Sequence, residues 1–217
     1  MNENILVGGH ISSQFDQELD QVRSRVLKMG GLVEEQLDKA LLALRSGDSA
    51  AVQDVETTDI RINSMEMEID EECTQILARR HPAAGDLRLI IATTKSVRDL
   101  ERIGDEAERV AKMVGHALDN DVKRKYYKGL LSLGENVKEL LHATLNTYAR
   151  METRSAVKNI RIDSAIDDEY SRVVLKLIDR MKSSPENIPE ALDVLWAARS
   201  LERIGDHCIN ICENVIY

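Results

Sequence analysis

Acidic side chains recur at a spacing of four residues in two distant parts of the sequence. Glu101 and Asp105 form one pair, and Glu202 and Asp206 form the other. On a helix, like charges four residues apart repel each other by about 0.2–0.5 kcal/mol per pair. A divalent or transition metal ion with oxygen ligands would relieve this repulsion. The alternative is that these carboxylates belong to an ordinary solvated helix face.

A second acidic line precedes each of these pairs. Asp59 and Asn63 precede the first pair, and Asp163 and Asp167 precede the second at the same spacing. At about 100° of helical rotation per residue, each of these lines stays on one helix face. Further oxygen ligands on or near these faces are expected from Glu66, Asp70, Glu108 and Glu213.

The elements that carry these residues are predicted to be helices, because apolar residues recur every three or four positions along most of the chain. We expect six helices, at about 22–44, 52–81, 86–111, 126–149, 153–182 and 185–216. The segment 46–48 should end the first helix and cap the second, and Pro82 should end the second. Long helices joined by short loops predict an all-α fold of antiparallel bundles.

The chain is predicted to contain a duplicated unit. The string Leu-Glu-Arg-Ile-Gly-Asp at 100–105 recurs without change 101 residues later, at 201–206. Upstream, Asp59 and Ile62 match Asp163 and Ile166 at an offset of 104 residues. We therefore expect two tandem three-helix bundles, at 10–118 and 123–217, joined by a loop around 118–123.

Helical geometry predicts where the acidic pairs point. With Leu100 in the buried stripe, Glu101 and Asp105 fall along one edge of it, and Arg102 and Arg109 point away into solvent. If the second and third helices of each unit pack side by side, their acidic residues meet in one seam per unit. The first seam comprises Asp59, Asn63, Glu101 and Asp105, and the second seam comprises Asp163, Asp167, Glu202 and Asp206.

The glycines of the repeated string are expected to permit close helix contact. Gly104 and Gly205 fall on the buried stripe, one turn from the carboxylates, where glycine costs about 0.5–1 kcal/mol relative to alanine. Close packing beside the seams would explain that cost, and packing alone is the simpler explanation.

Other candidate sites are weaker. Cys208 and Cys212 project into the buried stripe, so we interpret them, like Cys73, as small core residues. A ferritin-like di-iron site requires two inward-facing Glu-x-x-His pairs, and Glu139–His142 is the one pair with this spacing. It faces away from the core. No nucleophile elbow or phosphate-binding glycine loop is present, which predicts that the protein is not an enzyme.

The composition excludes several classes of protein. Lys and Arg total 29 and Asp and Glu total 38, giving a net charge of -9, which argues against nucleic-acid binding. No apolar run approaches the roughly 18 residues of a membrane span. Three cysteines do not make a disulfide framework, so we expect a cytoplasmic protein.

Several of these segments together resemble the PhoU family of phosphate-signalling regulators. They are the two copies of LERIGD, the segment LVEEQLDKAL at 32–41 and the loop HPAAGDLR at 81–88. The resemblance extends from about His10 to Tyr217. It implies two three-helix bundles and metal sites on Glu/Asp-x-x-x-Asp motifs, which correspond here to the residues of the two seams. Asn63 departs from this pattern, because it offers an amide oxygen where a carboxylate is expected.

The resemblance also implies a regulatory role. Such proteins hold the phosphate-starvation (Pho) response off while phosphate is plentiful. They act between the ATPase subunit of a phosphate ABC transporter and a sensor histidine kinase, at the inner face of the membrane. A homodimer is expected, with bound metal (Fe, Zn, Mn, Mg or Ni). Two alternatives stay open: a metal-free scaffold whose acidic seams dock a basic partner, and a metal-dependent enzyme that acts on phosphate esters.

Overall fold

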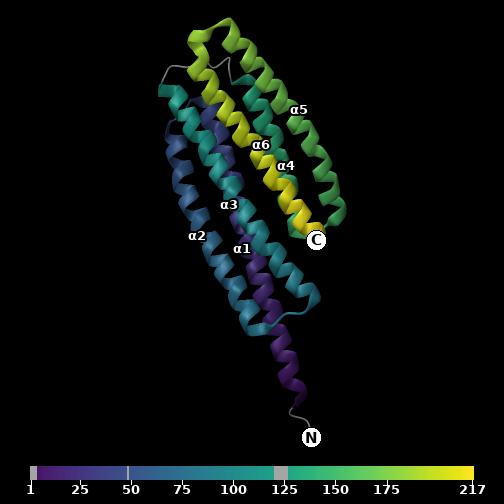
Figure 1. Cartoon of the computed structure of the whole chain (residues 1–217). Coiled ribbons are helices and arrows are strands. Elements are labelled where there is room, and N and C mark those ends of the chain that lie inside the picture. The colour runs from purple at the N-terminus through teal and green to yellow at the C-terminus, as the bar shows by residue number, and fades with distance from the viewer. Residues whose placement is uncertain (1–3, 48, 120–126) are drawn as a thin grey trace.

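The computed structural model describes residues 4–47, 49–119 and 127–217. Within them the chain forms six α-helices and one 3-10 turn, without a β-strand (Figure 1). The helices are α1 (Asn4–Ser46), α2 (Ser49–Arg80), α3 (Ala84–Asp119), α4 (Lys128–Arg150), α5 (Thr153–Ser183) and α6 (Ile188–Ile216), and the turn is η2 (Pro185–Asn187). This confirms the predicted all-α fold of two three-helix units, α1–α3 and α4–α6.

The helix ends follow from local sequence. Gly47 adopts a left-handed φ of 73° after α1, and its N–H donates to the carbonyl of Ala43 at 2.8 Å. The chain turns again at His81, directly before Pro82, so α2 ends where the sequence predicts. The predicted cap at Asp48 and the position 123 that was expected to open the second unit lie outside the described residues.

Two predicted helix starts are shifted. The first helix begins well before Val22, at Asn4. The sixth begins with the 3-10 turn η2 rather than as an α-helix at Pro185. Pro189 then lies in the first turn of α6, where its missing N–H leaves no helical hydrogen bond unmade. None of the described helices is both long and apolar enough to cross a membrane.

The two units share one hydrophobic core. In Figure 1, α2 and α5 lie at opposite edges of the molecule, and α3 and α6 run side by side between them. The units also meet where α1 packs against α4. Buried side chains from both units, such as Leu37, Leu100, Leu141 and Leu201, belong to the same core. Each fully buried leucine contributes about 1.5–3 kcal/mol.

The contact between α1 and α4 repeats the duplication in three dimensions. A Cβ added at Gly30 would overlap the Leu145 side chain, and one added at Gly134 would overlap the Leu41 side chain. Gly30 and Gly134, like Leu41 and Leu145, are 104 residues apart. The two close approaches are therefore equivalent, and the units pack about an approximate twofold axis. Within each unit the outer helix, α2 or α5, packs against α3 or α6, where the acidic residues lie.

Candidate metal centre

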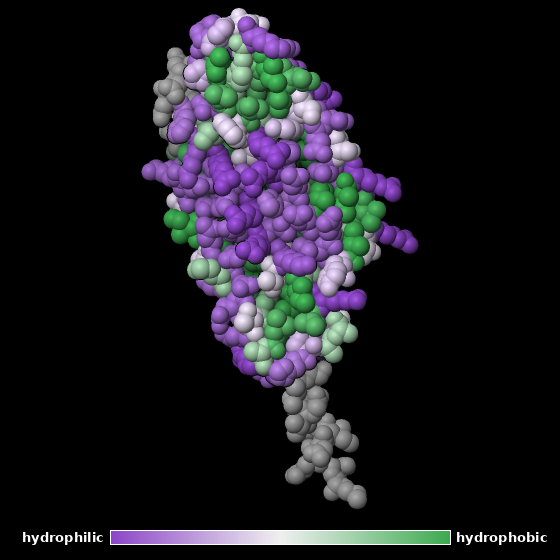
Figure 2. Space-filling model, viewed as in Figure 1, coloured by the Kyte–Doolittle hydropathy of each residue, from purple (hydrophilic) through white to green (hydrophobic). Residues whose placement is uncertain are grey.

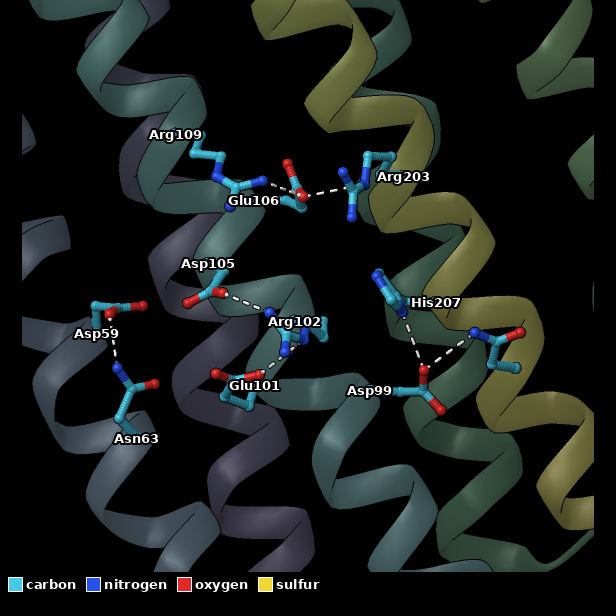
Figure 3. Close-up of polar contacts among 11 residues, drawn as sticks. Asp59, Asn63, Asp99, Glu101, Arg102, Asp105, Glu106, Arg109, Arg203 and His207 are labelled. Carbon is cyan, nitrogen blue, oxygen red and sulfur yellow. Dashed lines mark hydrogen bonds and ion pairs between the residues drawn. The ribbon is translucent and has the colours of Figure 1, made fainter.

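The first seam lies between α2 and α3 (Figure 3). Asp59 on α2 is only 7% exposed, and its two carboxylate oxygens accept hydrogen bonds from Gln36 Nε2 and Asn63 Nδ2, both at 3.1 Å. Burial raises the pKa of Asp59 in spite of these bonds, and the nearby charges of Glu108 and Asp105 raise it further. The Asp59 carboxylate of α2 therefore lies close enough to the α3 carboxylates to feel their charge.

Glu101 completes this group from the α3 side. Its pKa is raised by burial first and then by Asp105, whereas Arg102 opposes the shift. Glu66 and Asp59 of α2 raise it further. The structure therefore brings together the predicted members of the first seam, together with Glu66.

The second seam lies between α5 and α6 and carries more unrelieved charge. Burial raises the pKa of Asp163 to about 6, with contributions from Asp167 and Asp206. The pKa of Glu202 is raised by burial, by Asp206 and by Asp167, and lowered by Arg199. Asp163 and Glu202 are half-buried, and Asp167 and Asp206 beside them are exposed. This concentration of carboxylates favours a neutralising cation or proton.

The glycines of the repeated string lie against the seams. A Cβ at Gly205 would lie 3.3 Å from Oδ1 of Asp163, and one at Gly104 would lie 3.1 Å from Oε1 of Gln36. Both distances are shorter than ordinary van der Waals contact, so an alanine would displace these polar side chains. Glycine therefore permits the close approach of helices that brings the seam residues together.

Basic side chains flank the seams: Arg102 and Arg109 are exposed, as predicted, but their guanidinium groups also contact nearby carboxylates. The Arg102 guanidinium lies 3.4 Å from both Glu101 and Asp105, and Arg109 contacts Glu106 at 2.7 Å. These long side chains bend back along the helix to carboxylates one to three residues away, which the direction of the Cα–Cβ bond alone does not reveal.

The other flanking pairs are similar. Lys112 contacts Glu108 at 2.7 Å, and Arg199 forms an ion pair with Glu202. Of the four additional candidates, Glu66 and Glu108 act on seam carboxylates. Asp70 and Glu213 are exposed. Asp70 raises the pKa of the Cys73 thiol and Glu213 that of the Cys212 thiol, although burial is the main cause of both shifts.

The seams have the donor chemistry of a metal site without a preformed cage. In the described part of the chain, no three His, Cys, Asp or Glu side chains are arranged to hold one ion together. At the seams, three buried oxygens nevertheless lack a hydrogen-bond partner among the described residues: Gln36 Oε1, Asn63 Oδ1 and Glu202 Oε2. A cation with oxygen ligands fits these atoms, provided that neighbouring carboxylates move away from Arg102 or Arg199.

The sequence patterns did not predict the roles of two buried polar residues. Gln36 is fully buried and bonds to Asp59, and a glutamine beside the apolar stripe of the first helix is the signal that could have revealed it. Glu106 is 2% exposed and contacts both Arg109 and Arg203, which joins α3 to α6. Its burial depends on packing between the units, which helical periodicity does not report.

The alternative sites are resolved by burial and contacts. Cys73, Cys208 and Cys212 are buried with free thiols, which confirms their interpretation as core residues. His142 contacts Glu34 of α1 at 2.6 Å, so it lies on a contact between the units rather than in a bundle core.

Comparison with known proteins gives a consistent result. Residues 26–114 and 130–215 match the PhoU domain. The phosphate-specific transport system accessory protein PhoU homolog of Pseudomonas putida is 47% identical over 208 residues, covering 96% of this chain and 81% of that protein. The PhoU accessory protein of Escherichia coli K12 is 39% identical over 215 residues, covering 99% of this chain and 89% of that protein.

Solved structures show the same fold. The crystal structure of PhoU from Pseudomonas aeruginosa matches with a TM-score of 0.91 at 45% identity, covering 94% of this chain and 97% of that one. The phosphate transport system regulatory protein PhoU from Streptococcus pneumoniae matches with a TM-score of 0.86 at 32% identity, covering 94% and 95%. The chain therefore belongs to the PhoU family.

Proposed function

We propose that this protein is a regulatory accessory protein of phosphate uptake that holds the phosphate-starvation response off while phosphate is plentiful, without catalytic turnover. The observation that carries the proposal is its 47% identity, over nearly its whole length, to a phosphate-specific transport system accessory protein. Its partners are the ATPase subunit of a phosphate ABC transporter and a sensor histidine kinase. It acts as a homodimer in the cytoplasm, at the inner face of the membrane.

In this proposal the seams bind divalent cations. The ligands in the first seam are the carboxylates of Asp59, Glu101 and Asp105 and the amide oxygen of Asn63. Every expected donor is an oxygen atom, which suits Mg²⁺ or Mn²⁺ better than ions that prefer sulfur or nitrogen. A bound cation supplies a fixed positive charge.

The second seam is served by carboxylates alone, from Asp163, Asp167, Glu202 and Asp206. In each seam the carboxylates of the second and third helices would hold the ion between them. This ties the two helices together and relieves the repulsion within the acidic pair. The charge that a partner meets on this face then depends on whether the cation is bound.

A deletion strain tests the regulatory role. Without the protein, a reporter of phosphate-starvation genes should be active in phosphate-rich medium, and the wild-type gene should restore repression. Unchanged reporter expression in the deletion strain would refute the role. Restoring the gene with Glu101, Asp105, Glu202 and Asp206 all replaced by alanine then shows whether repression needs the seams.

A metal-free scaffold is the second candidate, and the ion pairs of Arg102 and Arg199 with seam carboxylates favour it. Acidic seams that are not occupied by metal would dock a basic partner surface. Binding to the transporter or kinase should then weaken as salt rises, because screening acts over a Debye length of about 8 Å at physiological ionic strength. Elemental analysis of protein purified without chelator separates this candidate from the metal proposal.

A further inference from the structure

The contact between α3 and α6 has two ends that the duplication makes equivalent. The helices run antiparallel, and each carries the repeated string. Positions 101 residues apart are therefore exchanged by the approximate twofold axis. Asp99 and His207 at one end correspond to Ser200 and Glu106 at the other.

The end at Asp99 is closed by hydrogen bonds. Oδ1 of Asp99 accepts from His207 Nδ1 at 3.0 Å and from Asn210 Nδ2 at 3.1 Å. Its other oxygen accepts from Asn214 Nδ2 at 3.5 Å. Figure 3 shows Asp99 reaching from α3 toward His207 on α6. The Asp99 carboxylate therefore accepts hydrogen bonds from three polar side chains of α6.

The end at Ser200 holds a pocket of about 340 Å³. Ser200 replaces Asp99, so the carboxylate that closes the other end is missing from the equivalent position. Trp196 replaces Lys95, and Glu106 replaces His207. The remaining lining is Arg109, Met113, Arg199 and Arg203.

The pocket is basic although the chain carries a net charge of -9. Three guanidinium groups line it against a single carboxylate, that of Glu106. Oε1 of Glu106 accepts a hydrogen bond from Arg109 Nη1 at 2.7 Å and forms an ion pair with Arg203 Nε at 3.1 Å (Figure 3). Since Glu106 is almost fully buried, it fixes one arginine of each unit at the wall. Each guanidinium has five N–H donors, so most of them stay available to a ligand.

The hydrophilic band across this face in Figure 2 covers the middle of α3 and α6, and hydrophobic residues gather toward both ends. Trp196 is the one tryptophan of the chain and is 60% exposed. An exposed indole beside arginines offers a flat surface on which a planar ring can stack, a contact worth about 1–3 kcal/mol for a nucleobase. Small-ligand sites typically measure about 300–1,000 Å³, which is more than a bare phosphate ion needs.

We propose that the pocket between α3 and α6 binds a nucleoside phosphate, with its phosphate on Arg109 and Arg203 and its base against Trp196. Forked guanidinium groups recognise phosphate oxygens in pairs, and Ser200 leaves the space that the phosphate fills. The pocket shares Arg199 with the second seam, through the ion pair of Arg199 with Glu202. The two phosphate-binding arginines, Arg109 and Arg203, contact Glu106 rather than a seam carboxylate.

Calorimetric titration of the full-length chain with AMP and GMP tests the proposal. Arg203→Gln should raise the dissociation constant at least tenfold. Arg102→Gln is the matched control, because Arg102 is the repeat counterpart of Arg203, is similarly exposed and also pairs with carboxylates. It should change the constant less than twofold.

Two further variants keep the test independent of folding defects. Ser200→Asp copies the closed end and should abolish binding, because its carboxylate competes for the arginines. Trp196→Leu changes an exposed side chain, so helicity by circular dichroism should be kept while the affinity for AMP falls at least threefold. In the unmodified chain, AMP should quench the fluorescence of Trp196, and adenosine or inorganic phosphate alone should bind at least tenfold more weakly.

Several results would overturn the proposal. One is the absence of AMP and GMP binding at millimolar concentration. Another is equal affinity for inorganic phosphate and AMP, which would leave Trp196 without a role. A third is binding to vesicles of phosphatidylglycerol, but not of phosphatidylcholine, without any nucleotide binding, which would assign the arginines to a lipid surface instead.

Discussion

The two acidic seams share a motif and a helix pairing, but they hold their central aspartates differently. In the first seam, Asp59 accepts hydrogen bonds from the amides of Gln36 and Asn63. In the second, the repeat counterparts of those residues are Leu140 and Asp167, and no hydrogen bond to the Asp163 side chain is found among the described residues. Burial and neighbouring charge raise the pKa of Asp163 to about 6.

This difference shows that one backbone arrangement can carry two electrostatic states. The first seam relieves part of its charge with internal amide donors, whereas the second leaves more of it unrelieved. A cation therefore removes more repulsion from the second seam, and we expect tighter metal binding there.

The largest expected effect comes from removing an acidic pair. Glu202→Ala with Asp206→Ala should weaken Mn²⁺ binding at the second seam at least about a hundredfold, since each lost charged ligand costs roughly 1.5–3 kcal/mol. The fold should survive, because both side chains border the core without filling it, and loss of their repulsion should leave the metal-free protein no less stable. Calorimetric titration and thermal unfolding measure the two effects.

Glu101→Ala with Asp105→Ala is the matched variant. It should leave the tighter Mn²⁺ site intact and remove the weaker one. If the second-seam variant unfolds under conditions where the metal-free unmodified protein stays folded, Glu202 and Asp206 are structural residues and the interpretation fails.

Exchanging the one differing ligand should make the seams more alike. Asp167→Asn should weaken the second seam about tenfold, and Asn63→Asp should strengthen the first by a similar factor, because one ligand charge is worth about 1.4 kcal/mol or more. Mn²⁺ titration of the single variants and of the double variant checks this. Affinities that move in the same direction for both substitutions would show that charge at these positions does not set the difference.

The pH dependence should also separate the seams. The pKa of Asp163 is raised in the folded protein, so the folded state binds the proton more tightly than the unfolded chain. The contribution of this group to stability is therefore greatest below the unfolded value, falls as pH rises toward 6, and is unfavourable above it. Asp163→Asn should stabilise the metal-free protein at pH 7 by roughly 1–2 kcal/mol, allowing for solvent screening.

Denaturant unfolding at pH 4 and pH 7 tests this sign. The gain from Asp163→Asn should be much smaller at pH 4 than at pH 7. Asp59→Asn should give a smaller gain at pH 7, because the amide cannot replace both hydrogen bonds that the Asp59 carboxylate accepts. Equal effects of the two substitutions at both pH values would remove the contrast between the seams.

The smallest effects are expected at the paired glycines. In Gly205→Ala the new Cβ presses on Asp163, and in Gly104→Ala it presses on Gln36 and Ile62. The helix preference for alanine, about 0.5–1 kcal/mol, offsets much of the strain in both. We expect Gly205→Ala to weaken Mn²⁺ binding a few-fold and Gly104→Ala to act mainly on stability. The reverse pattern, measured by the same titration and unfolding experiments, would contradict this division.

The helices, the duplication and the pairing of acidic lines across neighbouring helices were predictable from sequence. The 3.6-residue apolar period identifies which face of each helix is buried, and the two copies of one string identify the repeat. The burial of Cys208 and Cys212 followed from the same period.

The electrostatic detail was not predictable, because it depends on side-chain conformation and on contacts between units. The bond from Gln36 to Asp59 joins separate helices, and Arg102 bends back to carboxylates on its own helix. The burial of Glu106 arises where α3 meets α6. Helical periodicity gives the direction of each Cα–Cβ bond, but not the rotamer of a long side chain or the partner that it meets.

The most direct test of metal binding at the seams is an anomalous-difference map from crystals soaked in Mn²⁺ at increasing concentration. We expect a first peak within coordination distance of Asp163 and Glu202, and a second peak beside Asp59 and Glu101 at higher concentration. Anomalous peaks elsewhere on the molecule, with neither seam occupied at saturating Mn²⁺, would contradict this expectation.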